Sequence, residues 1–183
     1  MKQKVLLASN NAHKIKEIRA ILGDFFDIVS LREAGVESDP EETGKTFEEN
    51  ARIKAVAGMK ASGMPCIADD SGLEVLALDC RPGVMSARYS GSHGDDAANN
   101  EKLLAELADK PDRSARYVCV ICMAFPDGRE LEARGECYGE ILKEKRGNGG
   151  FGYDPLFYFP QFGKTFAEIS SEEKNEVSHR NAA

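Results

Sequence analysis

The order of apolar and amphipathic segments constrains the fold of this chain most strongly. Residues 4–9, KVLLAS, form a short apolar run that is typical of a buried strand. The next segment, HKIKEIRAILGD, places Ile15, Ile18 and Leu22 on one helical face and ends near Gly23, as expected of an amphipathic helix. This strand-then-helix order at the start of the chain favours an α/β protein.

The pattern continues to the C-terminus. Further helices are expected over residues 46–63, 95–110 and 170–183, and further strands over residues 25–31, 64–70, 73–79, 115–142 and 154–160. Thr46-x-x-Glu49 and Ser170-x-x-Glu173 are capping boxes that mark two helix starts. Pro126-Asp127-Gly128 predicts a hairpin. Helices alternate with strands early and a hairpin comes later, so we expect an α/β fold with a mixed sheet.

Length, charge and cysteine content limit the class of protein. A chain of 183 residues fits one globular domain, which we expect to span residues 1–183. The formal net charge of −7 argues against a nucleic acid polymer as partner, although a nucleotide needs only a local basic pocket. The short N-terminal apolar run suits neither a signal peptide nor a membrane span, so we expect a cytoplasmic protein that does not act at a membrane.

The five cysteines are an odd number, which argues against a closed disulfide framework. CVIC, residues 119–122, has CxxC spacing but lies within a predicted strand. Residues i and i+3 of a strand face opposite sides, so we expect buried structural thiols rather than a zinc or redox site.

The stretch IADDSGLEV, residues 67–75, brings an apolar strand directly to two adjacent carboxylates, Asp69 and Asp70. Two like charges at the end of a buried strand repel each other unless a cation or a proton relieves them. The stretch therefore indicates either simple solvent exposure or a metal ion. If the strand persists, the two side chains point to opposite sides and only one binds the metal directly. We expect Asp70 to be that ligand, with Asp69 as a second ligand or an orienting group.

Two nucleotide-binding motifs are present only in part. GNGGFG, residues 147–152, matches G-x-G-x-x-G, but a predicted strand follows it where a dinucleotide fingerprint requires a helix. DPEETGKT, residues 39–46, ends like a Walker loop, but Asp39 stands where the first glycine is required. Neither motif therefore supports its usual function here.

Two segments suit a phosphate and its metal, and each also has a plain structural explanation. SNNAHK, residues 9–14, lies between a strand and a helix, where backbone N–H groups and Lys14 suit phosphate; alternatively, an asparagine there simply caps the helix. Glu41-Glu42 is either a solvated turn or, through Glu42 with the Asp69-Asp70 pair, a source of hard oxygen ligands for Mg²⁺.

Two further segments suit the base and the charge of a nucleotide. GGFGYD, residues 149–154, offers accessible backbone and an aromatic face from Phe151 or Tyr153, or is a glycine loop with a core aromatic. Near the C-terminus, Lys174, His179 and Arg180 are either substrate-binding cations or a basic helix end. Together, these segments provide what a nucleoside triphosphate pocket requires.

Six blocks of the sequence, in order, resemble the inosine/xanthosine triphosphate pyrophosphatase family: LASNNAHKIKEI, TFEENARIKA, IADDSGLEV, PGVMSARYSG, GGFGYDPLF and EEKNEVSHR. The resemblance extends from about residue 4 to residue 180. It implies an elongated mixed β-sheet with flanking helices and two lobes around a nucleotide-binding cleft. It also implies a homodimer and Mg²⁺-dependent hydrolysis of ITP, dITP and XTP to the monophosphate and pyrophosphate, which cleanses the nucleotide pool.

The resemblance also implies roles for particular residues. Asp70 matches the proposed general base and metal carboxylate, and Glu42 matches a metal-associated glutamate. The implied substrate contacts are Ser9, Asn10, Asn11, Ala12, His13, Lys14, Ser71, Phe151, Gly152, Tyr153, Asp154, Lys174, His179 and Arg180.

Two points remain open at the level of sequence. Family members continue past Ser-His-Arg with the rest of a helix, whereas this chain ends at Ala183, so we expect a shortened C-terminal helix. A nucleotide-binding regulator would need the same loops but not a carboxylate cluster placed for metal and water. Release of pyrophosphate from ITP distinguishes the enzyme from the regulator.

Overall fold

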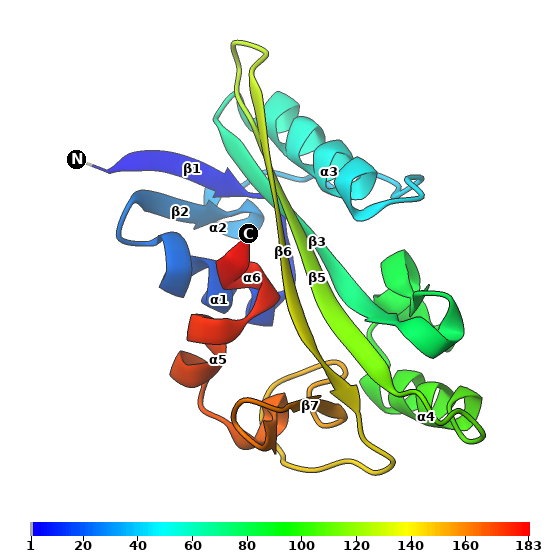
Figure 1. The fold of residues 1–183 in the computed structure, drawn as a ribbon. Coiled ribbons are helices and arrows are strands. Elements are labelled where there is room, and N and C mark those ends of the chain that lie inside the picture. Colours follow the sequence, from blue (N-terminus) through cyan, green and yellow to red (C-terminus); the bar gives the residue numbers. More distant parts are fainter. Residues whose placement is uncertain (1) are drawn as a thin grey trace. The chain divides into compact units, whose positions relative to one another are not determined.

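The computed structural model describes residues 2–183 and divides into two compact units. The first unit comprises residues 2–70 and 119–135 together with Ala183, and the second comprises residues 71–118 and 136–182. The strands follow the order β2-β1-β3-β5-β6-β7-β8, and β4 pairs with β3 (Figure 1). Three long strands contribute residues to both units: β3 (Cys66–Val75), β5 (Ser114–Ala124) and β6 (Glu130–Ile141).

The first unit is built on parallel strands. β1 (Gln3–Leu7) pairs in parallel with β2 (Phe26–Ser30) and with β3. The connecting helices are α1 (Ala12–Leu22), α2 (Leu31–Ala34) and α3 (Phe47–Ser62). On α1, Ile18 packs with Ile67 of β3, whereas Gly58 of α3 lies against Cys66. Because successive strand residues face opposite sides, α1 and α3 cover opposite faces of these strands.

The second unit combines antiparallel pairs with short helices. Its antiparallel strands are β4 (Arg81–Pro82), β7 (Phe157–Phe159) and β8 (Lys164–Thr165), which pair with β3, β6 and β7 respectively. Its helices are η1 (Leu76–Leu78), η2 (Gly83–Arg88), α4 (Asp96–Glu106), η3 (Phe166–Glu168), α5 (Ser171–Val177) and α6 (His179–Ala182). Parallel and antiparallel pairs therefore coexist, which confirms the predicted mixed-sheet α/β fold.

Several segments differ from their sequence predictions. β3 continues through Ser71 and Gly72 as one strand, where two strands were expected. Gly72 makes this possible, because a Cβ there would lie 2.4 Å from the Ser86 hydroxyl that accepts the Leu73 N–H. The last helix is interrupted at Ser178, whose ψ of 157° is extended, so it forms α5 and α6. The aromatic strand is shorter than predicted, and α2 was not predicted.

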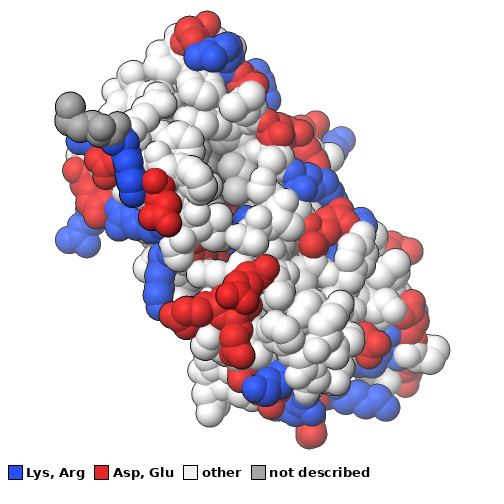
Figure 2. Space-filling view, turned by 60° about the vertical axis from the view of Figure 1, so that its left-hand side comes forward, with Lys and Arg blue, Asp and Glu red and all other residues white. Residues whose placement is uncertain are grey.

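Four of the five cysteines are buried, as predicted for Cys119 and Cys122 in a core strand. Cys66, Cys119, Cys122 and Cys137 are buried and free, whereas Cys80 is exposed. On the face drawn in Figure 2, basic side chains are interspersed with acidic ones and form no continuous stripe among the described residues. Within residues 2–183, the structure contains no helix that is long and apolar enough to cross a membrane.

Candidate active site

The start of α1 is organised by an asparagine cap. The Asn11 side chain accepts hydrogen bonds from the backbone N–H groups of His13 and Lys14 at 3.0 and 3.1 Å, and the Asn11 N–H donates to the Ser9 hydroxyl. The capping explanation is therefore correct for Asn11, and two N–H groups that were expected to be free for phosphate are already bonded. Asn10 and Ala12 are exposed beside this cap.

Asp69 and Asp70 contact lysines from different helices. Lys14 of α1 forms an ion pair with Asp69, and Lys54 of α3 approaches Asp70 Oδ1 with its Nζ at 2.7 Å. Because α1 and α3 cover opposite faces, the two carboxylates point to opposite sides, as their positions in one strand predict. Cys119 on the neighbouring strand β5 donates its thiol to Asp69 Oδ2 at 2.9 Å.

Lys54 contacts Glu42 as well as Asp70. Its Nζ lies 3.1 Å from Glu42 Oε1, so one ammonium group bridges two carboxylates. Burial alone lowers the pKa of Lys54, but Asp70 and Glu42 raise it above its usual value. Burial raises the pKa of Asp70, and Lys54 and Lys14 only partly oppose this effect. Asp70 is therefore a stronger base than a solvent-exposed aspartate.

The donor set around Asp70 fits a divalent cation. Asp70 Oδ2 is buried and has no hydrogen-bond partner among residues 2–183, so one carboxylate oxygen is left with an unused acceptor site. Among the described residues, the ammonium groups of Lys14 and Lys54 form ion pairs with carboxylates here: Lys14 with Asp69, and Lys54 with Glu42 and Asp70. Hard carboxylate oxygens are the ligands that Mg²⁺ prefers. The described residues contain no preassembled group of three metal ligands, and Lys54 lies between Glu42 and Asp70.

In the second unit, Asp154 organises the loop of residues 151–154. Its Oδ2 accepts from the Phe151 N–H at 2.9 Å and from Lys174 Nζ at 2.6 Å, and its Oδ1 accepts from the Tyr117 hydroxyl at 3.1 Å. Asp154 is buried, and its carboxylate holds the loop. The substrate contact that the sequence resemblance implied for Asp154 stays a prediction.

Two further residues of this region are also buried. The Tyr153 hydroxyl donates to the Ser86 carbonyl at 2.9 Å, so Tyr153 belongs to the core, which is one of the two alternatives that the sequence left open for this loop. Lys174 is only 5% exposed. Its Nζ lies 4.6 Å from the centroid of the Phe151 ring, so the lysine supports that ring as well as Asp154.

The C-terminal cations are also buried. Arg180 is 1% exposed and donates from its guanidinium to the Ser71 hydroxyl at 2.9 Å. His179 stacks on Tyr117, with ring centroids 4.8 Å apart and an interplanar angle of 16°. Tyr117 therefore contacts both His179 and the Asp154 side chain, and it connects two segments that lie far apart in the sequence.

Three residues that contact Asp69, Asp70 or Asp154 were not predicted from the sequence: Lys54, Tyr117 and Cys119. Lys54 lies one residue before the buried Ala55 on an otherwise amphipathic helix, which is a weak sequence signal. Tyr117 and Cys119 lie in a predicted core strand, where an inward-facing residue is normally explained by packing alone. Only the pairing of β5 with β3 shows that Cys119 contacts a carboxylate.

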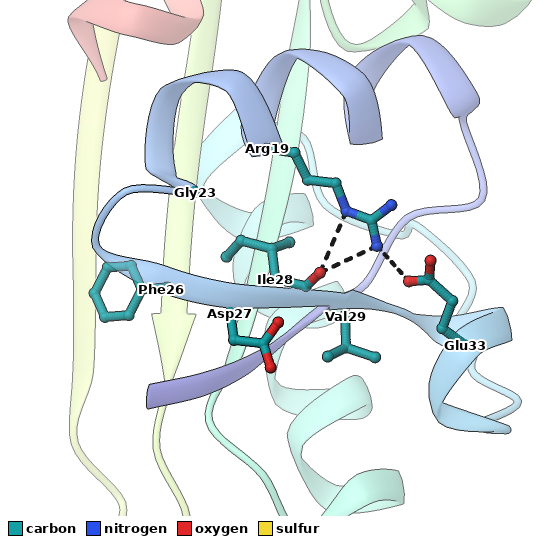
Figure 3. Close-up of a pocket in the computed structure, with 7 residues that line it drawn as sticks. All are labelled: Arg19, Gly23, Phe26, Asp27, Ile28, Val29 and Glu33. Atoms are coloured by element: carbon teal, nitrogen blue, oxygen red, sulfur yellow. Dashed lines mark hydrogen bonds and ion pairs between the residues drawn. The ribbon is translucent and has the colours of Figure 1, made fainter. Parts of the chain in front are cut away.

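A separate pocket lies along the edge strand β2 (Figure 3) and is lined by Arg19, Gly23, Phe26, Asp27, Ile28, Val29 and Glu33. Arg19 donates to the Ile28 carbonyl and forms an ion pair with Glu33. Hydrogen bonds from Ser30, together with Arg19, lower the pKa of Glu33 to about 2. The arginine thus covers an edge carbonyl of the sheet, and the pocket contains none of the predicted site residues.

Known proteins that are similar to this chain are named as nucleotide pyrophosphatases. A dITP/XTP pyrophosphatase of Desulfotalea psychrophila is 57% identical over 180 residues, which cover 98% of this chain and 81% of that protein. A dITP/XTP pyrophosphatase of Clostridium perfringens is 52% identical over an aligned length of 190 residues, and the alignment covers 99% of this chain and 93% of that protein.

A solved structure and a family model agree with these relatives. The Ham1 protein of Staphylococcus aureus superposes with a TM-score of 0.89 at 47% identity, covering 99% of this chain and 94% of that one. The model of the Ham1 family matches residues 5–183. These matches confirm the resemblance carried by the six sequence blocks. Because the family match spans nearly the whole chain, this chain belongs to the Ham1 family.

Proposed function

We propose that this chain hydrolyses the non-standard purine nucleotides dITP, ITP and XTP to the corresponding monophosphate and pyrophosphate. The observation that carries this proposal is the environment of Asp70. A buried carboxylate with one unpartnered oxygen among residues 2–183 lies beside a lysine that also contacts Glu42. The names of the relatives, dITP/XTP pyrophosphatase, supply the substrate class.

The reaction in this proposal is in-line attack of water on the α-phosphorus. Asp70 orients the water and accepts its proton, a task that suits a carboxylate whose pKa is raised by burial. Lys14 and Lys54 offset the negative charge that develops on the phosphate oxygens. Asp70 and Glu42 would hold Mg²⁺, which when bound adds further charge stabilisation at the phosphates, and Asp69 would act from the other side of the strand as an orienting group.

Base recognition in this proposal depends on the second unit. The Phe151 ring offers a stacking face for the purine, and its position is fixed through Asp154 and Lys174. Hypoxanthine and xanthine carry a carbonyl at position 6, whereas adenine carries an amine there. Arginine has only hydrogen-bond donors, so Arg180 favours the carbonyl; His179 does so when its facing nitrogen is protonated. A donor left facing an amine loses its partner, which disfavours ATP.

Hydrolysis in ¹⁸O-labelled water tests the site of attack as well as the activity. We expect pyrophosphate and dIMP from dITP, with the label on dIMP, and much slower hydrolysis of dATP. Removal of divalent cations with EDTA should abolish turnover and added Mg²⁺ should restore it. Label in pyrophosphate would contradict attack at the α-phosphorus. Tight binding of dITP without turnover would favour the nucleotide-binding regulator.

Replacing Lys54 with Met is expected to tighten binding of Mg²⁺ alone by about tenfold while lowering turnover. The variant removes the ammonium group that contacts both Glu42 and Asp70, so the site becomes more attractive to a free cation. Mg²⁺ titration followed by thermal unfolding, without nucleotide, measures this effect. Lys60→Met is the matched control, since Lys60 is an exposed lysine on the same helix. Weaker Mg²⁺ binding in Lys54→Met would show that the carboxylates do not form the cation site.

We further propose that the protein acts as a homodimer. This expectation comes from the family resemblance, and sedimentation equilibrium across a range of protein concentrations tests it. A monomer at assay concentrations with full activity would exclude dimerisation as a requirement for the reaction.

A further inference from the structure

The 151–154 loop, which carries Phe151, is held at Gly152 by hydrogen bonds to both the N–H and the carbonyl of that residue. The Gly152 N–H donates to Asp96 Oδ2 at 2.7 Å, and the Gly152 carbonyl accepts from Asn100 Nδ2 at 2.8 Å. Asp96 and Asn100 lie one turn apart at the start of α4 and therefore face the same way. One helix thus binds both polar backbone groups of a single glycine.

The conformation of Gly152 explains why such a contact is needed. Its φ of +61° lies in the left-handed region, which glycine adopts readily but does not prefer strongly over its other conformations. Asp154 and Lys174 hold Phe151, and the hydrogen bonds of Asp96 and Asn100 to Gly152 restrict the backbone next to it. The hydrogen bonds from α4 select one arrangement.

Asn100 is suited to this role by its burial. It is 2% exposed, and its Nδ2 also donates to the Asp96 carbonyl at 2.6 Å, so its amide orientation is fixed by its own helix. Its Oδ1 is buried without a hydrogen-bond partner within residues 2–183. An asparagine buried with an unused acceptor is unfavourable for stability alone. The arrangement is therefore explained better by what Asn100 does for Gly152 than by packing.

We propose that Asp96 and Asn100 are positioning residues that fix the 151–154 loop and thereby determine how well the purine base is selected. This inference rests on the proposed function, because it assigns base recognition to Phe151. Neither side chain is proposed to touch the substrate. Their effect reaches the base through the backbone of Gly152.

The chain supplies a matched control on the same helix. Asn99 is also 2% exposed, but its Oδ1 accepts from the Ser90 N–H at 2.7 Å and its Nδ2 donates to the Ala87 carbonyl. Asn99→Ala and Asn100→Ala therefore remove the same buried amide from adjacent positions. Only the second change removes a hydrogen bond to Gly152. Comparison of the two variants therefore distinguishes a loss of stability, which both share, from an effect on the loop, which only Asn100→Ala should show.

Two kinetic readouts distinguish positioning from general damage. In Asn100→Ala, we expect KM for dITP to rise about tenfold and the preference for dITP over dATP to fall, because the loop must be ordered on binding. Inhibition by inorganic triphosphate, which has no base, should keep its wild-type constant. Asp96→Ala should reproduce this pattern, and Asn99→Ala should not change the preference. Equal preferences in Asn99→Ala and Asn100→Ala, or weaker inhibition by triphosphate, would overturn the proposal.

Hydrogen exchange provides a readout that does not depend on turnover. Peptides covering residues 147–156 should exchange faster in Asn100→Ala than in wild type, whereas Asn99→Ala should affect residues 87–91 instead. Unchanged exchange at residues 147–156 would overturn the positioning role. If the wild type binds dITP without hydrolysing it, the proposed function fails and Kd replaces KM in the comparison. If it does not bind dITP, both the proposed function and this inference are wrong.

Discussion

Replacing Asp70 with Asn is expected to lower turnover of dITP by about 10²–10⁴-fold, the usual cost of losing a general base. The amide cannot accept the proton of the attacking water and is a poorer ligand for Mg²⁺. Because Asn has the same shape as Asp, the strand β3 should be retained and KM for dITP should change little. Pyrophosphate release at saturating dITP and Mg²⁺ measures the loss, and circular dichroism checks the fold.

The matched control for this variant is Asp24→Asn. It removes the same charge from a side chain that is 99% exposed, so it should retain the wild-type rate. A rate near that of wild type for Asp70→Asn would show that Asp70 neither accepts the proton nor binds an essential cation. A large rise in KM with unchanged kcat would instead make Asp70 a substrate-binding group.

Replacing Lys174 with Met is expected to reduce the free energy of unfolding by about 3–5 kcal/mol, because removal of one partner leaves an uncompensated buried charge. The Lys174–Asp154 ion pair is buried, with side-chain exposures of 6% and 2%. The variant should also raise KM for dITP, since Lys174 supports the Phe151 ring. Urea denaturation measures the stability loss, and initial rates measure KM.

The double variant Lys174→Met/Asp154→Asn distinguishes the stability lost through an unpaired buried charge from the stability lost through altered packing. Removing both charges should restore much of the stability, because no unpaired carboxylate remains. Lys164→Met, at an exposed lysine, should have little effect on stability. A stability loss below about 1 kcal/mol in Lys174→Met would show that the pair is as weak as a surface ion pair.

Local features of the fold could be predicted because nearby residues determine them. Thr46 with Glu49 and Ser170 with Glu173 form the predicted capping boxes, since each box requires only residues three positions apart. Gly63 ends α3 in the left-handed conformation, as its sequence position indicated. Residues 170–183 show the limit of local prediction, because the break at Ser178 accompanies the burial of His179 and Arg180.

The sequence by itself also determined the family, through its six ordered blocks, and it supplied the candidate site residues. Tertiary structure alone decided what those residues contact. Lys54 reaches Asp70 from 16 positions away, and Asn100 reaches Gly152 from 52. It also turned Tyr153 and Asp154 inward, where burial and hydrogen bonds outweigh any preference that their own sequence expresses. Such contacts depend on strand pairing and helix packing between distant segments, which no local pattern encodes.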